Sequence, residues 1–193
     1  MKVSIVNYDN INSERIMNLL SEFDFAVKMI TDEINLCTSD VIIMPDCGDL
    51  LKANRKLQLF NLSNVIKILN RKIIGINNGM FLMCSNIIGS NLCGLGLLHS
   101  DVYKFNETQN IILKNSDFNY TKHSCLNFNW LKGEINYKSD FYILENDNTC
   151  ISSKINGLPV SLIDKYNNYI GINMDFGKDN KIISKLIFEA ISL

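Results

Sequence analysis

One segment constrains the fold of this chain more than any other, because an apolar strand, a tight turn and the start of a helix follow one another over residues 71–84. The turn reads Gly-Ile-Asn-Asn-Gly over residues 75–79, so a glycine lies two positions before and two positions after Asn77. This is the spacing of a nucleophile elbow, in which a sharp turn lifts the central side chain off the end of a strand and small residues let other backbone approach. A Ser or Cys belongs at that apex, whereas the amide of Asn77 is a poor nucleophile. The sequence therefore predicts an elbow that has lost its reactive group.

Strands and helices alternate through the first half of the chain. Apolar runs at 2–6, 25–30, 41–44 and 73–76 have the length of strands. Helical spacing of apolar residues predicts one helix capped by Asn12 or Ser13 and another within 57–69. Alternation of this kind is typical of a parallel sheet. We expect one α/β domain, residues 1–193, with a mixed, largely parallel central sheet flanked by helices.

The second half contains more strands and fewer helices. Short strands are expected at 97–105, 111–114, 140–144, 150–155 and 158–163, and a last strand at 169–174 leads into a final helix from about residue 178. No linker or repeat divides the chain.

Composition and charge narrow the class of protein. The net charge is −1 and 47% of the residues are hydrophobic, which argues against disorder and against a nucleic-acid partner. No signal region and no apolar stretch of about 18 residues is present, so we expect a cytoplasmic protein with no membrane partner. Six cysteines lack any CxxC pair, and His99 and His123 lack metal-ligand spacing with them. We expect reduced thiols, no metal and no cofactor.

Five motifs in chain order carry a resemblance to a known family. They are Ile5-Val6-Asn7-Tyr8-Asp9 with Asn12 and Ser13, Val41-Ile42-Ile43-Met44-Pro45-Asp46-Cys47-Gly48, Ile74-Gly75-Ile76-Asn77-Asn78-Gly79-Met80, Gly94-Leu95-Gly96-Leu97-Leu98 with Val102 and Phe105, and Gly171-Ile172-Asn173-Met174-Asp175-Phe176-Gly177-Lys178. The chain resembles the class I glutamine amidotransferases over nearly its whole length, and more narrowly the HisH-like glutaminase subunit of imidazole glycerol phosphate synthase. The resemblance implies their flavodoxin-like fold.

This chain differs from that family at the positions of the family's catalytic residues. In the family a Cys attacks the glutamine amide, a His acts as base and a Glu orients the His, and the resemblance puts Asn77, Asp175 and Gly177 at these positions. It also implies a set of former oxyanion and substrate positions, which are Asp46, Cys47, Gly48, Asn78, Gly79 and Phe81. Two further segments near the family's ligand correspond to residues 145–148 and 124–129. Asn77 either keeps the turn, since Asn tolerates positive φ, or hydrogen-bonds a new ligand together with Asp175.

Three functions remain open. The leading one is a catalytically degenerate glutaminase subunit that docks on a HisF-like (β/α)8-barrel synthase and supports or regulates it, in histidine or surface-sugar amidation. Such a protein should carry an apolar patch around the mouth of its site. The second is an active amidotransferase subunit that supplies ammonia through a rearranged site, with Cys47 as nucleophile, although the acidic neighbours Asp46 and Asp175 disfavour a thiolate. The third is a stand-alone protein that binds a small molecule.

Overall fold

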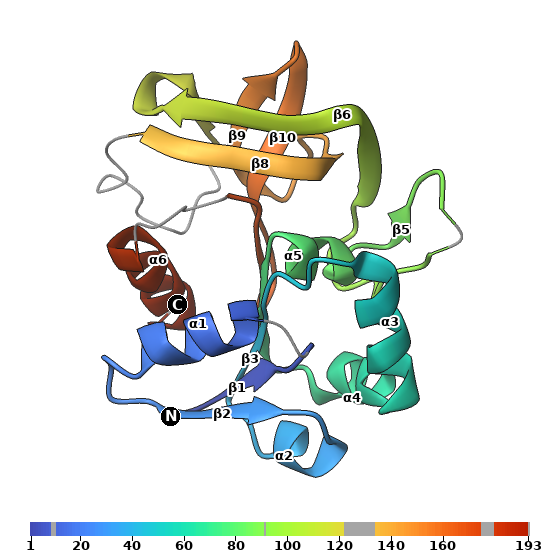
Figure 1. Cartoon of the computed structure of the whole chain (residues 1–193), viewed down its shortest axis with the longest axis vertical. Coiled ribbons are helices and arrows are strands. Elements are labelled where there is room, and N and C mark those ends of the chain that lie inside the picture. The colour runs from blue at the N-terminus through green and yellow to red at the C-terminus, as the bar shows by residue number, and fades with distance from the viewer. Residues whose placement is uncertain (9–10, 91, 122–133, 175–179, 193) are drawn as a thin grey trace.

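The computed structural model describes residues 1–8, 11–90, 92–121, 134–174 and 180–192, and its centre is an eight-stranded sheet (Figure 1). The strand order is β2-β1-β3-β4-β11-β10-β9-β7. The first five of these strands pair in parallel and the last three add on antiparallel to β11, so the predicted mixed sheet is confirmed. In the order of the sheet the strands are β2 (Ala26–Ile30), β1 (Lys2–Val6), β3 (Val41–Met44), β4 (Lys72–Ile76), β11 (Tyr169–Ile172), β10 (Leu158–Tyr166), β9 (Thr149–Ile155) and β7 (Phe118–Tyr120).

Helices cover both faces of the parallel part of the sheet. On one face α1 and α6 pack with Ile43 and Ile74 in one apolar cluster, and on the other face α2 to α5 pack with Ile42 and Ile73 in a second cluster. Neighbouring residues of a strand point to opposite faces, so strands covered on both sides need apolar side chains throughout. The helices are α1 (Ile11–Leu20), α2 (Glu33–Cys37), α3 (Leu50–Leu59), α4 (Leu62–Leu69), α5 (Asn78–Met83) and α6 (Asn180–Ser192).

A second sheet of three strands, in the order β5-β6-β8, lies across one end of the molecule (Figure 1). Its strands are β5 (Asn86–Ile87), β6 (Asp101–Lys114) and β8 (Glu134–Ile143), and a short 3-10 helix η1 (Asn115–Asp117) follows β6. The pairing of β6 with β8 shifts register between Lys104 and Gln109, which makes a bulge of residues 105–108. The expectation of separate strands at 97–105 and 111–114 was wrong, because β6 continues through this bulge as one strand from Asp101 to Lys114.

Three further expectations need correction. The helix expected over 57–69 is two helices, because Asn61 adopts a left-handed conformation with φ 53° between α3 and α4. Ser13 lies inside α1, where its hydroxyl donates to the carbonyl of Val6 at 3.3 Å, and does not cap the helix. Residues 97–100 are not a strand, since the amides of Leu97 and Leu98 both donate to the carbonyl of Met83. In the described part of the chain no helix is long and apolar enough to cross a bilayer.

Candidate functional site

The predicted elbow is present between β4 and α5, with Asn77 at its apex. Asn77 has φ 49° and ψ −116°, a combination that lies outside the regions that L-residues ordinarily occupy. Its backbone is held on both sides, since its N–H donates to Ile172 O at 2.7 Å and its carbonyl accepts from the N–H of Met80 at 2.9 Å. A strained backbone of this kind costs about 1–3 kcal/mol and persists only where the surrounding structure imposes it.

The two flanking glycines impose that geometry through close packing. A Cβ on Gly79 would lie 2.0 Å from the carbonyl oxygen of Met44, and a Cβ on Gly75 would lie 2.4 Å from Met83 Sδ and 2.7 Å from Met80 N. Any side chain at either position would therefore push α5 away from the ends of β3 and β4. The glycine spacing predicted close backbone approach at this turn, and the structure confirms it.

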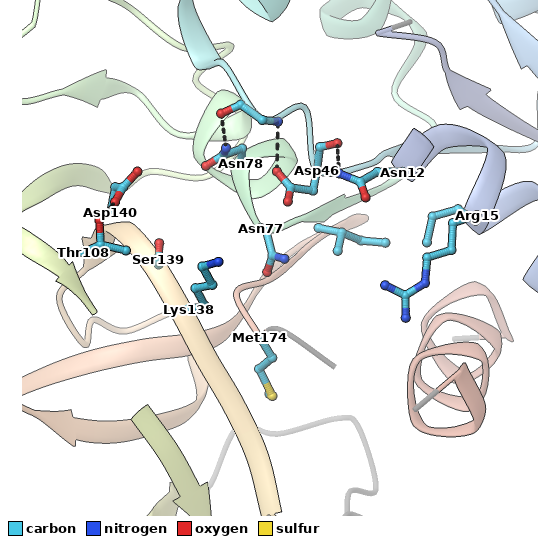
Figure 2. A pocket seen from close by; sticks show the side chains of 13 residues that line it. Asn12, Arg15, Asp46, Asn77, Asn78, Thr108, Lys138, Ser139, Asp140 and Met174 are labelled. Atoms are coloured by element: carbon cyan, nitrogen blue, oxygen red, sulfur yellow. Dashed lines mark hydrogen bonds between the residues drawn. The ribbon is translucent and has the colours of Figure 1, made fainter. Parts of the chain in front are cut away.

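The loop of residues 45–49, which follows β3, lies opposite the elbow and is held by one hydrogen bond within it and by bonds from Asn78 and Asn12 (Figure 2). The Gly48 N–H donates to Asp46 Oδ1 at 3.2 Å, Asn78 Nδ2 donates to Gly48 O at 3.0 Å, and Asn12 Nδ2 donates to Asp46 O at 3.2 Å. Gly48 has φ 68°, which only glycine adopts without strain. The Asp46 carboxylate thus occupies a backbone donor of the loop to which the resemblance assigned an oxyanion-binding role.

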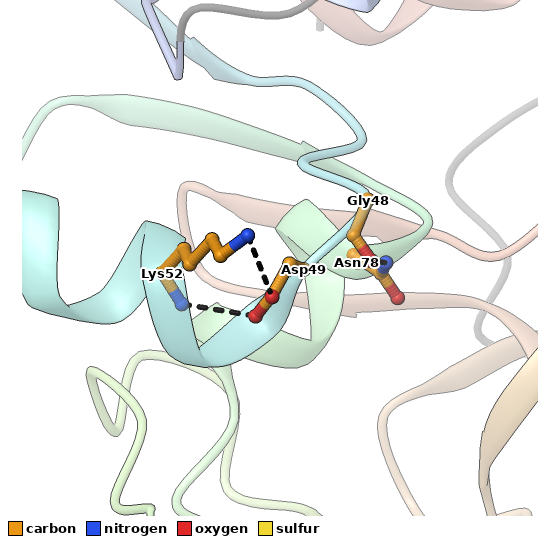
Figure 3. Close-up of polar contacts among 4 residues, drawn as sticks. All are labelled: Gly48, Asp49, Lys52 and Asn78. Carbon is orange, nitrogen blue, oxygen red and sulfur yellow. Dashed lines mark hydrogen bonds and ion pairs between the residues drawn. The ribbon is translucent and has the colours of Figure 1, made fainter.

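The same loop leads directly into α3. Asp49 caps this helix by accepting from the N–H of Lys52 at 3.0 Å, and its second oxygen lies 3.7 Å from Lys52 Nζ (Figure 3). The hydrogen bond from Asn78 holds Gly48, and the helix cap holds Asp49. The position of the loop relative to the elbow is therefore fixed at both residues.

Cys47 lies in this loop but points away from solvent. Its side chain is buried, and burial followed by the negative charge of Asp46 raises the pKa of the thiol far above its ordinary value. The buried hydroxyl of Tyr8 has no hydrogen-bond partner among the described residues, and the pKa of Tyr8 is raised first by burial and then by Cys47. A thiol in such surroundings stays protonated and is a poor nucleophile.

An open cleft of about 520 Å³ lies between the elbow, α1 and the second sheet (Figure 2). It is lined by Asn12, Arg15, Ile16, Asp46, Gly48, Ile76, Asn77, Asn78, Thr108, Lys138, Ser139, Asp140 and Met174. Four of the site residues named from the sequence line it, namely Asp46, Gly48, Asn77 and Asn78. Cys47, Gly79 and Phe81 do not. Phe81 is fully buried and packs edge-on against Phe141, with the ring centroids 5.9 Å apart.

The second sheet supplies a wall of the cleft that was not predicted from the sequence. The bulge in β6 brings Thr108 beside Asp140 of β8, and the Thr108 hydroxyl donates to Asp140 Oδ1. Lys138 lies two residues earlier on β8 and is exposed in the cleft. Thr108 and Asp140 are 32 residues apart in the chain, so no local pattern signals their contact. Bulges commonly redirect side chains next to functional sites.

The remaining positions implied by the resemblance fall into two groups. Residues 145–148 do not line the cleft: Asn146 Nδ2 donates to Ser100 Oγ at 3.3 Å and to Asp164 Oδ2 at 3.4 Å, which ties the connection from β8 to β9 to strand β10. Asp175, Gly177 and the segment 124–129 lie outside the described residues. No group of three potential metal ligands occurs among the residues that are described.

Comparison with known proteins gives a consistent result. No family model matches the chain. It is 30% identical over 149 residues to the imidazole glycerol phosphate synthase subunit HisH of Buchnera aphidicola subsp. Melaphis rhois, covering 76% of this chain and 83% of that protein. It is 28% identical over 105 residues to the HisH subunit of Bacteroides fragilis and spans about half, 54%, of that relative. A crystal structure of a glutamine amidotransferase superposes with a TM-score of 0.72 over 99% of both chains at 10% identity, which shows a shared fold.

Proposed function

This chain belongs to the HisH family of class I glutamine amidotransferases, and we propose that it is a subunit of an amidotransferase-type complex without glutaminase activity of its own. We infer that residues 1–193 act as one domain. The subunit docks on a HisF-like (β/α)8-barrel synthase and supports or regulates it, in histidine or surface-sugar amidation.

One observation carries this proposal: an amide stands where the family's thiol would stand, and a carboxylate occupies the loop that faces it. Asn77 keeps the strained elbow geometry, but a side-chain amide does not form an acyl intermediate. Asp46 caps the N–H of Gly48 at 3.2 Å, so an oxyanion formed at the elbow would meet a negative charge. Loss of the nucleophile alone costs a triad enzyme about a factor of 10⁶ in kcat.

The surroundings of Cys47 argue against a rearranged active site. A nucleophilic thiol must be partly exposed and lie next to positive charge. Cys47 is buried beside Asp46, does not line the cleft, and has a pKa raised by both its burial and that charge. The resemblance puts a second acid, Asp175, at the position of the family's base. That assignment stays a prediction.

Docking on a synthase is supported by the relatives, which are named as synthase subunits. Two exposed apolar side chains lie close in sequence to residues of the cleft and its facing loop, where a docked partner can be tested. Ile11, which is 77% exposed, precedes the cleft residue Asn12 at the start of α1, and Leu51, which is 42% exposed, lies in the first turn of α3 after the facing loop.

The direct test is glutamate release from glutamine by the full chain, alone and with the barrel synthase of the same organism, beside an active family member. We expect no release in either case, together with a complex that forms in size-exclusion chromatography. Release that depends on the partner and disappears in Cys47→Ser would overturn the proposal. Absence of any complex would overturn the docking part alone.

A further inference from the structure

Positive charge is concentrated in the segment 50–72, which forms α3, α4 and the start of β4. This segment contains six of the chain's 19 Lys and Arg and none of its 20 Asp and Glu, although the net charge of the whole chain is −1. Three of these cations, Arg55, Lys67 and Arg71, are exposed, and their charged groups make no hydrogen bond or ion pair with a described residue. We call these three residues the basic trio. A surface of one sign attracts a partner of the opposite sign.

The same two helices expose apolar side chains at and after the turn that joins them. Leu59 is 83% exposed at the end of α3, Phe60 is 45% exposed in the turn, and Ile68 is 79% exposed on α4. We call these three residues the apolar trio. The faces of α3 and α4 that pack on the protein are formed by other residues, including Leu57 and Ile66, which are buried. The apolar trio therefore lies on the outer faces of the two helices.

The basic and apolar residues share these outer faces. Side chains three or four residues apart lie on the same face of a helix. On α3, Arg55 precedes Leu59 by four residues. On α4, Lys67 and Ile68 follow the exposed Asn64 by three and four residues. Each exposed apolar side chain on a helix therefore has a cation beside it.

Acidic side chains limit this positive surface on two sides. Glu33 on α2 accepts from Asn61 Nδ2 at 3.0 Å in the turn between α3 and α4, and Asp32 caps α2 beside it. Asp49 caps α3 at its other end and pairs with Lys52. These carboxylates are negative at neutral pH, so the surface that attracts anions is restricted to the outer faces of α3 and α4 that lie between them.

A lipid surface fits these features better than an acidic protein does. A protein partner must match the shape of a patch, and the interfaces of proteins are depleted in Lys. A bilayer takes up exposed apolar side chains without such a match, and its anionic headgroups attract the Lys and Arg that flank them. The absence of any acid from residues 50–72 suits a partner whose charge is uniformly negative.

We propose that the outer faces of α3 and α4 bind the surface of an anionic bilayer, with the apolar trio in the headgroup region and the basic trio at the lipid phosphates. The expectation of no membrane partner rested on the lack of a spanning segment, which surface binding does not require. The cleft stays accessible, because α4 leads into Lys72 at one end of β4, whereas Ile76 lines the cleft at the other end. Figure 1 shows α4 at the end of the molecule away from the second sheet, which forms a wall of the cleft.

The experiment is co-sedimentation of the full chain with vesicles of phosphatidylcholine, either alone or mixed with phosphatidylserine. We expect saturable binding to the mixed vesicles that weakens as NaCl is added, and binding to phosphatidylcholine that is roughly ten-fold weaker or less. Equal binding to both kinds of vesicle, or binding to neither, would overturn the proposal. Soluble polyglutamate represents an acidic protein, and tighter binding to it than to the mixed vesicles at equal negative charge would also overturn the lipid assignment.

A pair of double variants tests the basic trio. Lys67→Gln combined with Arg71→Gln should weaken binding to the mixed vesicles by roughly ten-fold or more. Lys104→Gln combined with Lys154→Gln is the matched control, because these exposed lysines lie on β6 and β9. Equal affinity in the two double variants would show that the basic trio does not contact the lipid.

A second pair tests the apolar trio. Leu59→Ser combined with Ile68→Ser should weaken vesicle binding by about ten-fold and leave the fold intact, since both side chains are exposed. Ile11→Ser combined with Ile112→Ser is the control, because these side chains are 77% and 57% exposed on α1 and β6. Wild-type affinity in the Leu59 and Ile68 variant would overturn the assignment. A dimer of the free chain that this variant alone dissociates would assign the surface to a second copy instead.

Discussion

The side chain of Asp46 accepts a hydrogen bond from the backbone N–H of Gly48 at 3.2 Å, two residues further along the same loop. This loop also accepts from Asn78 at the elbow and from Asn12 on α1, so the carboxylate is held in place beside Asn77 at the edge of the cleft. A fixed negative charge there opposes any second negative charge, whether an oxyanion or a thiolate. The amide of Asn77 at the elbow and the carboxylate of Asp46 in the facing loop therefore both disfavour nucleophilic chemistry at this site.

The electrostatic effect of Asp46 on the elbow can be measured as the reactivity of a thiol introduced there. In Asn77→Cys the introduced thiol should react slowly with iodoacetamide at pH 7. Adding Asp46→Asn keeps an oxygen for the N–H of Gly48 but removes the charge. We expect the thiol pKa to fall by about one unit and alkylation to become several-fold faster. The rate should be followed on the peptide that contains position 77, because Cys37 and Cys93 are exposed and will also react.

A matched control is Asp49→Asn in the same Asn77→Cys background. Asp49 lies in the same loop, but its carboxylate is paired with Lys52 and does not line the cleft. The Asp49→Asn substitution should therefore change the alkylation rate of the introduced thiol little. Equal rates in the Asp46 and Asp49 variants would show that Asp46 does not control the electrostatics of the elbow.

Gly79→Ala tests the close approach that shapes the elbow. The new Cβ would lie 2.0 Å from the carbonyl oxygen of Met44, and neither backbone segment can yield without moving α5. We expect a loss of roughly 3 kcal/mol in the free energy of unfolding, measured by urea denaturation. Gly48→Ala is the comparison, since its Cβ would meet nothing within 4 Å and only its φ of 68° is unfavourable. It should cost about 1 kcal/mol, and an equal cost in both variants would contradict the packing explanation.

The elbow was predictable because its determinants are local. A short apolar strand, two glycines at fixed spacing and the start of a helix lie within 14 residues, and each restricts the same turn. The parallel strands were predictable for a related reason, since burial on both faces makes every residue of β3 apolar.

The far wall of the cleft was not predictable because it depends on contacts between distant segments. Thr108 and Lys138 reach the cleft only because β6 bulges and pairs with β8. Phe81 shows a second limit of a motif: the resemblance assigned it a former substrate position, and its direction on α5 turns the side chain into the core against Phe141. Position in a motif fixes where the backbone lies, whereas the helix face decides where the side chain points.

Asp164 should make the stability depend on pH. It is fully buried on β10, and burial raises its pKa although bonds from Ser161, Thr149 and Asn146 partly oppose the shift. The folded state therefore binds this proton more tightly than the unfolded state does. Its contribution to stability is greatest below the unfolded pKa of about 3.9 and is lost as pH rises through the folded pKa.

Asp164→Asn isolates that effect, because the amide is neutral at every pH. We expect the free energy of unfolding of the wild type to fall relative to that of Asp164→Asn as the pH is raised from 4 to 8 in urea titrations. Asp49→Asn is the control of opposite sign: the pKa of Asp49 is lowered by the N–H of Lys52, so its contribution is present at neutral pH and lost on acidification. A constant difference between the wild type and Asp164→Asn would show that Asp164 does not titrate in this range.

Ile11→Asp tests whether the mouth of the cleft is a docking surface. Ile11 is 77% exposed at the start of α1, next to the cleft residue Asn12, so the change should leave the fold intact. Burying an aspartate in place of an apolar contact should weaken binding to the barrel synthase at least ten-fold, as measured by titration calorimetry. Ile68→Asp is the matched control, because Ile68 is 79% exposed on α4, which contributes no residue to the cleft. If both variants bind like the wild type, the partner does not cover the start of α1; if Ile68→Asp alone weakens binding, the docking face lies on α4.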